Sequence, residues 1–260
     1  MQSIRQPAVA GLFYSSDAQQ LQADIEQYLQ RASPEAPRPK ALIVPHAGLV
    51  YSGPVAAHAY KTLIPNASEI QRVVLLGPSH RVALEGIALS GHQAFHTPLG
   101  DVPVDAAAIE TIRSLPGVHL MPEAHQLEHS LEVQLPFLQT ILPHFSLIPL
   151  VVGNTPPETV CQVLDTLWGG DETLIVISTD LSHYHSYEEA RLFDGRTTKA
   201  IENFQTHLRG DQACGCHPLN GLLMAAKRHG LQLTTLDVRN SGDTAGTPEQ
   251  VVGYGAYVLH

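Results

Sequence analysis

Residues 72–80 read Arg-Val-Val-Leu-Leu-Gly-Pro-Ser-His, a run of branched apolar residues that stops at Gly77 and is soon followed by His80. Four consecutive apolar residues without polar alternation are typical of a strand covered on both faces, as in a parallel sheet between two layers of helices. The run therefore predicts a buried strand over 72–76 with functional residues at its carboxyl end.

Two other segments follow the same pattern. Residues 40–48 read Lys-Ala-Leu-Ile-Val-Pro-His-Ala-Gly, and residues 174–183 read Leu-Ile-Val-Ile-Ser-Thr-Asp-Leu-Ser-His. In open α/β sheets, ligands bind beyond the carboxyl ends of the strands. We therefore expect the three strands to be adjacent or nearly so, with His46, His80 and His183 in one pocket.

The rest of the chain alternates between helical and strand patterns, after an ordered arm over residues 1–15 and a capping box formed by Ser16 and Gln19. We expect a helix after that box, a loop over 95–101, further helices at 55–60, 106–114, from 128, 156–168, 187–206 and 218–229, and further strands at 86–90, 145–153, 232–238 and 251–259. This alternation predicts a three-layer α/β/α sandwich around a mostly parallel or mixed sheet. With no evident linker, residues 1–260 are expected to form a single domain.

The composition restricts the function. A formal net charge of −10 argues against nucleic acid or an anionic membrane as the main partner, and no apolar run approaches the roughly 18 residues of a membrane span. Residues 1–6 lack the apolar core of a signal peptide, so a cytoplasmic location is expected. The three cysteines, Cys161, Cys214 and Cys216, indicate reduced thiols rather than a disulfide framework.

Histidine is the outlying residue type, with 15 histidines against 15 Lys and Arg together. His46 and His80 follow proline-containing strand ends, where they are either metal ligands or loop histidines bonded to nearby carbonyl groups. His183 lies three residues after Asp180, which suits either a further ligand or an acid/base group oriented by the aspartate.

Other motifs leave alternatives open. His129, in Glu-His-Ser at 128–130, is either a functional histidine or part of a capped helix start. Cys-Gly-Cys-His-Pro at 214–218 resembles a fragment of a metal knuckle but lacks a second ligand pair at zinc-finger spacing. Neither a phosphate-binding glycine loop nor a GxSxG elbow occurs, which disfavours nucleotide binding and a serine hydrolase.

Five motifs are spread over the chain: Pro-His-Ala-Gly at 45–48, Gly-Pro-Ser-His at 77–80, Glu-His-Ser at 128–130, Asp-Leu-Ser-His at 180–183 and Cys-Gly-x-His-Pro at 214–218. Together they resemble the Memo family, whose prokaryotic branch is called AmmeMemoRadiSam system protein B. That family is similar in fold to class III extradiol dioxygenases, in which two histidines and a carboxylate hold Fe(II). The resemblance implies that His46 and His80 are metal ligands and that His183 is the acid/base group.

The sequence departs from the family at one point. The resemblance implies a cysteine ligand in the C-terminal segment, whereas this chain reads Asn-Ser-Gly-Asp-Thr at 240–244 and has no cysteine after Cys216. Asp243 is the only strong anionic ligand there and would restore a two-histidine, one-carboxylate site suited to Fe(II), with copper or zinc as alternatives. Otherwise the site is completed by water or binds iron only weakly.

These residues support three functions. The first is a non-haem iron oxidoreductase of dioxygenase type, with His183, Asp180 and His129 as catalytic groups beside the metal. The second, which the resemblance implies, is a non-catalytic module that binds a peptide or protein in the same cleft, in association with a radical SAM partner. The third is a metal-dependent hydrolase. A measurement of the metal content of the protein would distinguish the two enzyme hypotheses from the binding-module hypothesis.

Overall fold

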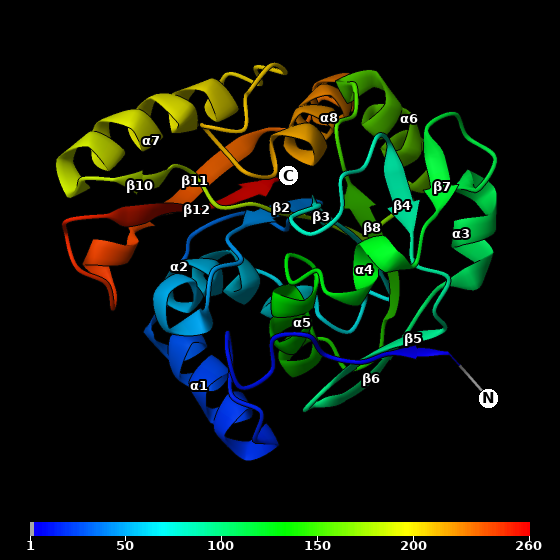
Figure 1. Ribbon diagram of the computed structural model, residues 1–260, viewed down its shortest axis with the longest axis horizontal. Helices are drawn as coiled ribbons and strands as arrows, with labels where there is room; N and C mark the ends of the chain where they lie inside the picture. Colours follow the sequence, from blue (N-terminus) through cyan, green and yellow to red (C-terminus); the bar gives the residue numbers. More distant parts are fainter. Residues whose placement is uncertain (1–2) are drawn as a thin grey trace.

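The computed structural model describes residues 3–260 and is built around a mixed sheet of nine strands (Figure 1). Along the sheet the strands follow the order β10, β12, β2, β9, β3, β8, β4, β7, and β11 pairs with β12. Their bounds are β2 (Ala41–Val44), β3 (Arg72–Pro78), β4 (Ile87–Leu89), β7 (Val118–Leu120), β8 (Ser146–Val152), β9 (Thr173–Ser178), β10 (His183–His185), β11 (Leu233–Asn240) and β12 (Val251–Leu259).

The three strands that lead to histidines are neighbours. β9 lies between β2 and β3 and is parallel to both, with Val44 opposite Ser178 and Leu76 opposite Ile177. Because parallel strands end at the same edge of a sheet, their carboxyl ends share one rim. The predicted adjacency is therefore confirmed.

The sheet is covered on both faces by helices. Successive residues of a strand point to opposite faces, so Leu42 and Val44 join one apolar cluster while Ala41 and Ile43 join the other. The first cluster includes residues of α1 (Ala18–Arg31), α2 (Leu49–Lys61) and α5 (Leu135–Ile141). The second includes residues of α3 (Ala106–Ile112), α6 (Pro157–Leu167), α7 (Tyr187–Glu202) and α8 (Cys216–Arg228) (Figure 1). The predicted three-layer α/β/α sandwich is confirmed.

Short elements complete the chain. They are α4 (Glu123–Gln126) and three single-turn 3₁₀ helices, η1 (Ile64–Asn66), η2 (Glu132–Gln134) and η3 (Ser241–Asp243). The helix expected from residue 128 begins later, because residues 128–131 form a loop that packs on the end of β3. No helix in the described part of the chain combines the length and apolar character needed to cross a membrane.

Two helix starts test the expected caps. Asp105 caps α3 as predicted, since its carboxylate accepts a hydrogen bond from Ala108 N. The predicted capping box of Ser16 and Gln19 is wrong. α1 begins at Ala18, and Asp17 caps it by accepting a hydrogen bond from Gln20 N.

The expected loop at 95–101 is instead a β-hairpin. β5 (Ala94–Thr97) pairs with β6 (Gly100–Pro103), and β5 also pairs with β1 (Ile4–Arg5) of the N-terminal arm. Arg5 anchors the arm through a buried ion pair with Glu132. Met1 and Gln2 of the expected arm and domain lie outside the described residues.

Candidate metal site

Three histidines from different parts of the chain meet at the rim of the sheet. His46 follows β2, His80 follows β3, and His129 belongs to the loop before η2. One ring nitrogen of each lies within 4.8 Å of the corresponding nitrogens of the other two. The ring centroids are 5.2 Å apart for His46 and His80, 5.5 Å for His46 and His129, and 4.7 Å for His80 and His129. This histidine triad can hold a metal ion.

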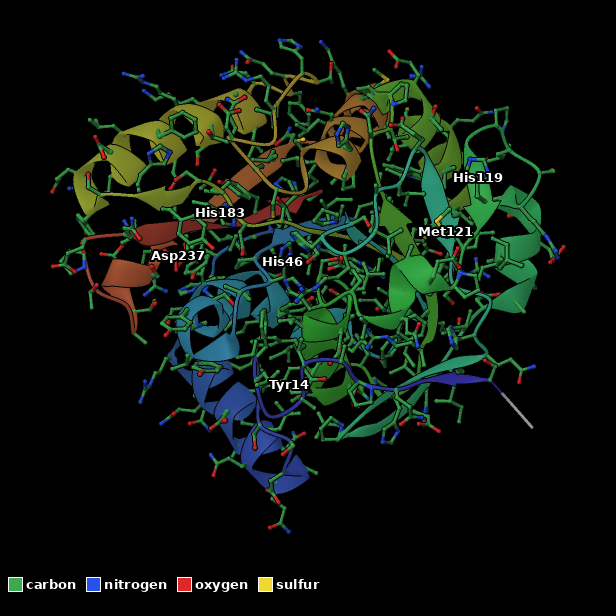
Figure 2. The ribbon with its side chains drawn as sticks, viewed as in Figure 1. Tyr14, His46, His119, Met121, His183 and Asp237 are labelled. Carbon is green, nitrogen blue, oxygen red and sulfur yellow. The ribbon has the colours of Figure 1, made fainter. Side chains whose placement is uncertain are left out.

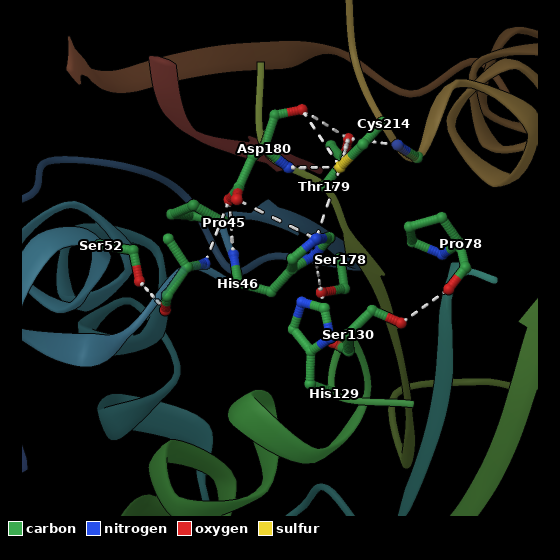
Figure 3. Close-up of polar contacts among 12 residues, drawn as sticks. Pro45, His46, Ser52, Pro78, His129, Ser130, Ser178, Thr179, Asp180 and Cys214 are labelled. Atoms are coloured by element: carbon green, nitrogen blue, oxygen red, sulfur yellow. Dashed lines mark hydrogen bonds and ion pairs between the residues drawn. The ribbon is translucent and has the colours of Figure 1, made fainter. Parts of the chain in front are cut away.

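The end of β3 is shaped to receive the loop that carries His129. Ser130 Oγ donates a hydrogen bond to the Pro78 carbonyl oxygen at 2.9 Å (Figure 3). A Cβ atom at Gly77 would lie 2.7 Å from Ser130 Oγ, closer than such atoms approach. Glycine at position 77 therefore allows the loop to pack against the strand and brings His129 beside His80.

Glu128 fixes the orientation of His80. Its carboxylate accepts hydrogen bonds from His80 N at 2.6 Å, His80 Nδ1 at 2.9 Å, and the amides of His129 and Ser130, each at 2.9 Å. Burial raises the pKa of Glu128, but these bonds and His80 together lower it to about 2. An ionised carboxylate only accepts hydrogen bonds, so Nδ1 of His80 donates to Glu128, and Nε2 is the ring nitrogen left to bind a metal ion.

Asp180 holds the loop that carries His46. Its Oδ1 accepts hydrogen bonds from the amides of His46, at 2.7 Å, and Ala47, at 3.3 Å. Burial raises the pKa of Asp180 above its usual range. Burial, together with the neighbouring His80, lowers the pKa of His46 to about 3. His46 is therefore a neutral imidazole near pH 7, which is the form that binds metal ions.

Cys214 lies at the site, where the sequence predicts that Asp243 or water completes the ligand set. Its Sγ is 3.4 Å from His46 Nε2 and accepts a hydrogen bond from Asp180 N at 3.3 Å (Figure 3). The loop before α8 crosses the end of β9, where Gly215 N donates to Thr179 Oγ1 at 2.8 Å. The Cys-Gly-x-His-Pro motif at 214–218 is the sequence signal for this placement, because Cys214 lies just before the start of α8.

The structure does not bring Asp243 to the histidines. Its carboxylate accepts hydrogen bonds from Tyr187 OH at 2.6 Å and from Asn240 N at 3.0 Å, because it closes a capping box at η3. Asp243 lines a separate cavity of about 700 Å³, together with Asp237, which Figure 2 shows to one side of His46. The expectation that Asp243 completes the metal site does not fit this placement.

His183 lies beside the triad without joining it. It begins β10 and pairs with Val252 of β12. It is not among the three histidines whose ring nitrogens cluster, and it lies three residues after Asp180, whose carboxylate holds the His46 loop (Figure 2). Tyr184, the next residue, has a φ of 62°, a backbone conformation that non-glycine residues rarely adopt.

Comparison with known proteins identifies the family. The family model described as Memo-like protein matches residues 5–258. The chain belongs to the Memo-like protein family. A MEMO1 family protein from Aquifex aeolicus is 38% identical, with 96% of this chain and 97% of the relative covered. One from Methanosarcina mazei is 33% identical, with 98% and 99% covered.

A solved structure of the uncharacterized protein JW3007 from Escherichia coli K12 resembles this Memo family member in fold. The TM-score is 0.56 at 16% sequence identity, and the match covers 85% of this chain and 100% of that chain. At this identity the likeness concerns the fold alone.

The donors at the site of this Memo family protein suit a transition metal. Within residues 3–260, Nδ1 of His129 is buried without a hydrogen-bond partner. A buried nitrogen of this kind is costly unless something binds it. Burial and the neighbouring His46 lower the pKa of His129 to about 4, so this imidazole is also neutral near pH 7. Neutral imidazoles beside a thiol are a donor set for iron, copper or zinc.

Proposed function

We propose that this Memo family protein is a metal-dependent oxidoreductase that binds one transition metal ion through His46, His80 and His129. The clustering of three ring nitrogens within 4.8 Å of one another carries the proposal. Cys214, at 3.4 Å from His46 Nε2, is the fourth candidate ligand in place of Asp243. These residues come from four separate loops at the rim of the sheet, so the folded chain brings the donors together in advance of metal binding.

Iron is the proposed metal, and the thiol makes copper the main competitor. Imidazole ligands with open positions suit ferrous iron, whereas a thiolate adds affinity for Cu(I) or zinc. A bound iron or copper ion would supply the one-electron chemistry and the Lewis acidity that no side chain at the site provides. The Fe(II) preference expected for a two-histidine, one-carboxylate site is weakened by Cys214, whose Sγ lies 3.4 Å from His46 Nε2.

Glu128 is the residue that keeps His80 ready to bind. Because Glu128 accepts a hydrogen bond from His80 Nδ1, it fixes the orientation of the ring and makes the imidazole a stronger metal ligand. The same carboxylate holds the amides of His129 and Ser130. One buried acid therefore positions two of the three proposed ligands.

Asp180 and His183 are the proposed proton-handling groups. Asp180 is buried beside His46, with 4.0 Å between Asp180 Oδ2 and His46 Nε2. Burial raises the pKa of Asp180, which suits a carboxyl group that holds a proton during part of a reaction cycle. His183 is half-buried and follows Asp180 by three residues, which suits a group that passes protons between the site and solvent.

Metal content after anaerobic purification tests the proposal. We expect close to one equivalent of iron or copper per chain by elemental analysis, with reversible rebinding after chelation. A protein that holds no metal and does not bind Fe(II), Cu(I) or Zn(II) in anaerobic titrations would favour the alternative, a module that binds a peptide or protein. The association with a radical SAM partner stays a prediction, as does the assignment of residues 1–260 to a single domain.

A further inference from the structure

The hydroxyl group of Ser178, at the end of β9, is the centre of a buried hydrogen-bond network beneath His46 (Figure 3). Ser178 Oγ lies 2.9 Å from His46 Nδ1, 2.8 Å from Gln134 Nε2 and 2.6 Å from the Ser130 carbonyl oxygen. All four of these residues are buried. A serine hydroxyl has one proton to donate and two lone pairs that accept, so three neighbours use its full capacity.

The amide of Gln134 can be oriented in only one way. Its Nε2 lies 2.9 Å from the Pro45 carbonyl oxygen, and its Oε1 accepts a hydrogen bond from Tyr60 OH at 2.8 Å. Exchanging the nitrogen and oxygen would place two acceptors against each other at Pro45. Gln134 Nε2 therefore donates to Pro45 and to Ser178, and it occupies one lone pair of the Ser178 hydroxyl.

The direction of the Ser178 hydroxyl proton follows from its contact with the Ser130 carbonyl oxygen. The Ser130 carbonyl oxygen only accepts hydrogen bonds, so a separation of 2.6 Å from Ser178 Oγ requires the Ser178 proton between the two oxygens. The remaining lone pair of Ser178 then faces His46 Nδ1. That nitrogen must carry the ring proton of the neutral imidazole, which leaves the lone pair on Nε2.

We propose that Ser178 is a positioning residue that selects the Nδ1-protonated tautomer of His46 and so presents Nε2 as a metal ligand. This inference rests on the proposed function for its metal-binding consequence. It assigns to a neutral hydroxyl the role that the Glu128 carboxylate has for His80. The two histidines thus reach the same tautomer by different means, and Gln134 fixes the hydroxyl that acts on His46.

The first test is the tautomer of His46 in metal-free protein. Nitrogen-15 NMR of histidine-labelled protein near pH 7 distinguishes a protonated ring nitrogen from an unprotonated one, and loss of a signal pair in His46→Ala assigns the residue. We expect a protonated Nδ1 and an unprotonated Nε2. A proton on Nε2 in the wild-type protein would overturn the inference without any further variant.

The second test compares variants in the same NMR measurement and in an anaerobic Fe(II) titration. Ser178→Ala removes the acceptor, so we expect mixed tautomers of His46 and roughly 10- to 100-fold weaker Fe(II) binding. Ser178→Thr keeps the hydroxyl group and should restore the wild-type tautomer. Ser90→Ala is the control for loss of a buried serine, because Ser90 Oγ accepts from His92 N away from the site.

The two proposals fail in different ways. A wild-type protein that shows the expected tautomer but binds no Fe(II), Cu(I) or Zn(II) would reject the proposed function and leave the tautomer assignment standing. A Ser178→Ala protein that keeps the Nδ1-protonated tautomer would reject the role of Ser178, whatever its metal affinity. If Ser178→Ala does not fold, the wild-type tautomer and the Ser178→Thr protein still decide the inference.

Discussion

Nε2 of His46 lies 3.4 Å from Sγ of Cys214, although 168 residues separate the two in the chain. The contact places a soft sulfur donor, a candidate ligand, beside an imidazole at the rim of the sheet. Burial raises the pKa of the Cys214 thiol well above its usual range. The sulfur is therefore a neutral thiol in the metal-free protein, and binding of a metal ion as thiolate would release a proton.

Removal of two ligands should abolish metal binding. In His46→Ala/His80→Ala, two of the three clustered imidazoles are lost, so we expect no measurable Fe(II) binding in an anaerobic titration. His144→Ala, which removes an exposed histidine, should bind as the wild type does. Circular dichroism should show a folded double variant, and tight stoichiometric binding by that variant would place the metal elsewhere.

Replacement of Cys214 should change metal selectivity. In Cys214→Ser the soft donor is lost, so Cu(I) affinity should fall by more than roughly 10-fold, and Fe(II) affinity should fall less. Competition with chromogenic chelators measures both. Asp243→Asn is the matched control, since Asp243 is bonded to Tyr187 and Asn240, and its affinities should be unchanged. Weaker binding by Asp243→Asn alone would restore Asp243 as a ligand.

His183→Ala should keep its metal. His183 is not among the three clustered histidines, and it begins β10, which pairs with β12. We expect iron or copper content equal to that of the wild-type protein by elemental analysis after identical anaerobic purification. A loss as complete as that in His46→Ala would show that His183 is a ligand rather than a proton-handling group.

The stability of the metal-free protein should fall as the pH drops below neutrality. Burial lowers the pKa of His46 from 6.5 to about 3 and the pKa of His125 and His129 to about 4. The unfolded chain therefore binds more protons than the folded chain between about pH 6.5 and these values, and acid favours unfolding in that window. A shift from 6.5 to about 4 corresponds to roughly 3 kcal/mol per histidine.

Urea unfolding at a series of pH values checks this expectation. His125→Gln removes one of these titrating groups outside the triad and keeps a donor for the Ala88 carbonyl, so its stability should depend less on pH. A wild-type unfolding free energy that stays constant from pH 7 to pH 4 would contradict the assignment of these histidines as neutral.

Gly215→Ala should disturb the loop that holds Cys214. A Cβ atom at Gly215 would lie 2.7 Å from Thr179 Cβ and 2.8 Å from the Ser178 carbonyl oxygen. We expect a loss of about 1–3 kcal/mol in unfolding free energy and weaker Cu(I) binding. Gly195→Ala is the control, because it lies inside α7 with open space around it and should stabilise the helix by about 0.5–1 kcal/mol. Equal stability of the two variants would argue against the close packing at Gly215.

Local sequence is sufficient to predict the layers of the fold and the placement of two site histidines, His46 and His80. The apolar runs before His46 and His80 are buried on both faces, and such strands pair in parallel and end on one rim. Periodic patterns also predict the helices near α3, α6 and α8 to within about two residues at each end, whereas α2 and α5 begin at Leu49 and Leu135 rather than at 55 and 128. These features depend on the covalent neighbours of each residue, so they can be recognised without the tertiary structure.

The other candidate ligands are brought to the site by contacts between distant segments. Cys214 reaches His46 because the loop before α8 crosses the end of β9, and His129 joins the triad because Gly77 leaves room for Ser130 against β3. Asp243 had suitable chemistry, but its hydrogen bonds hold it at η3. A sequence lists the donors that a chain possesses, whereas metal binding requires donors a few ångströms apart, and only the packing of the folded chain sets that distance.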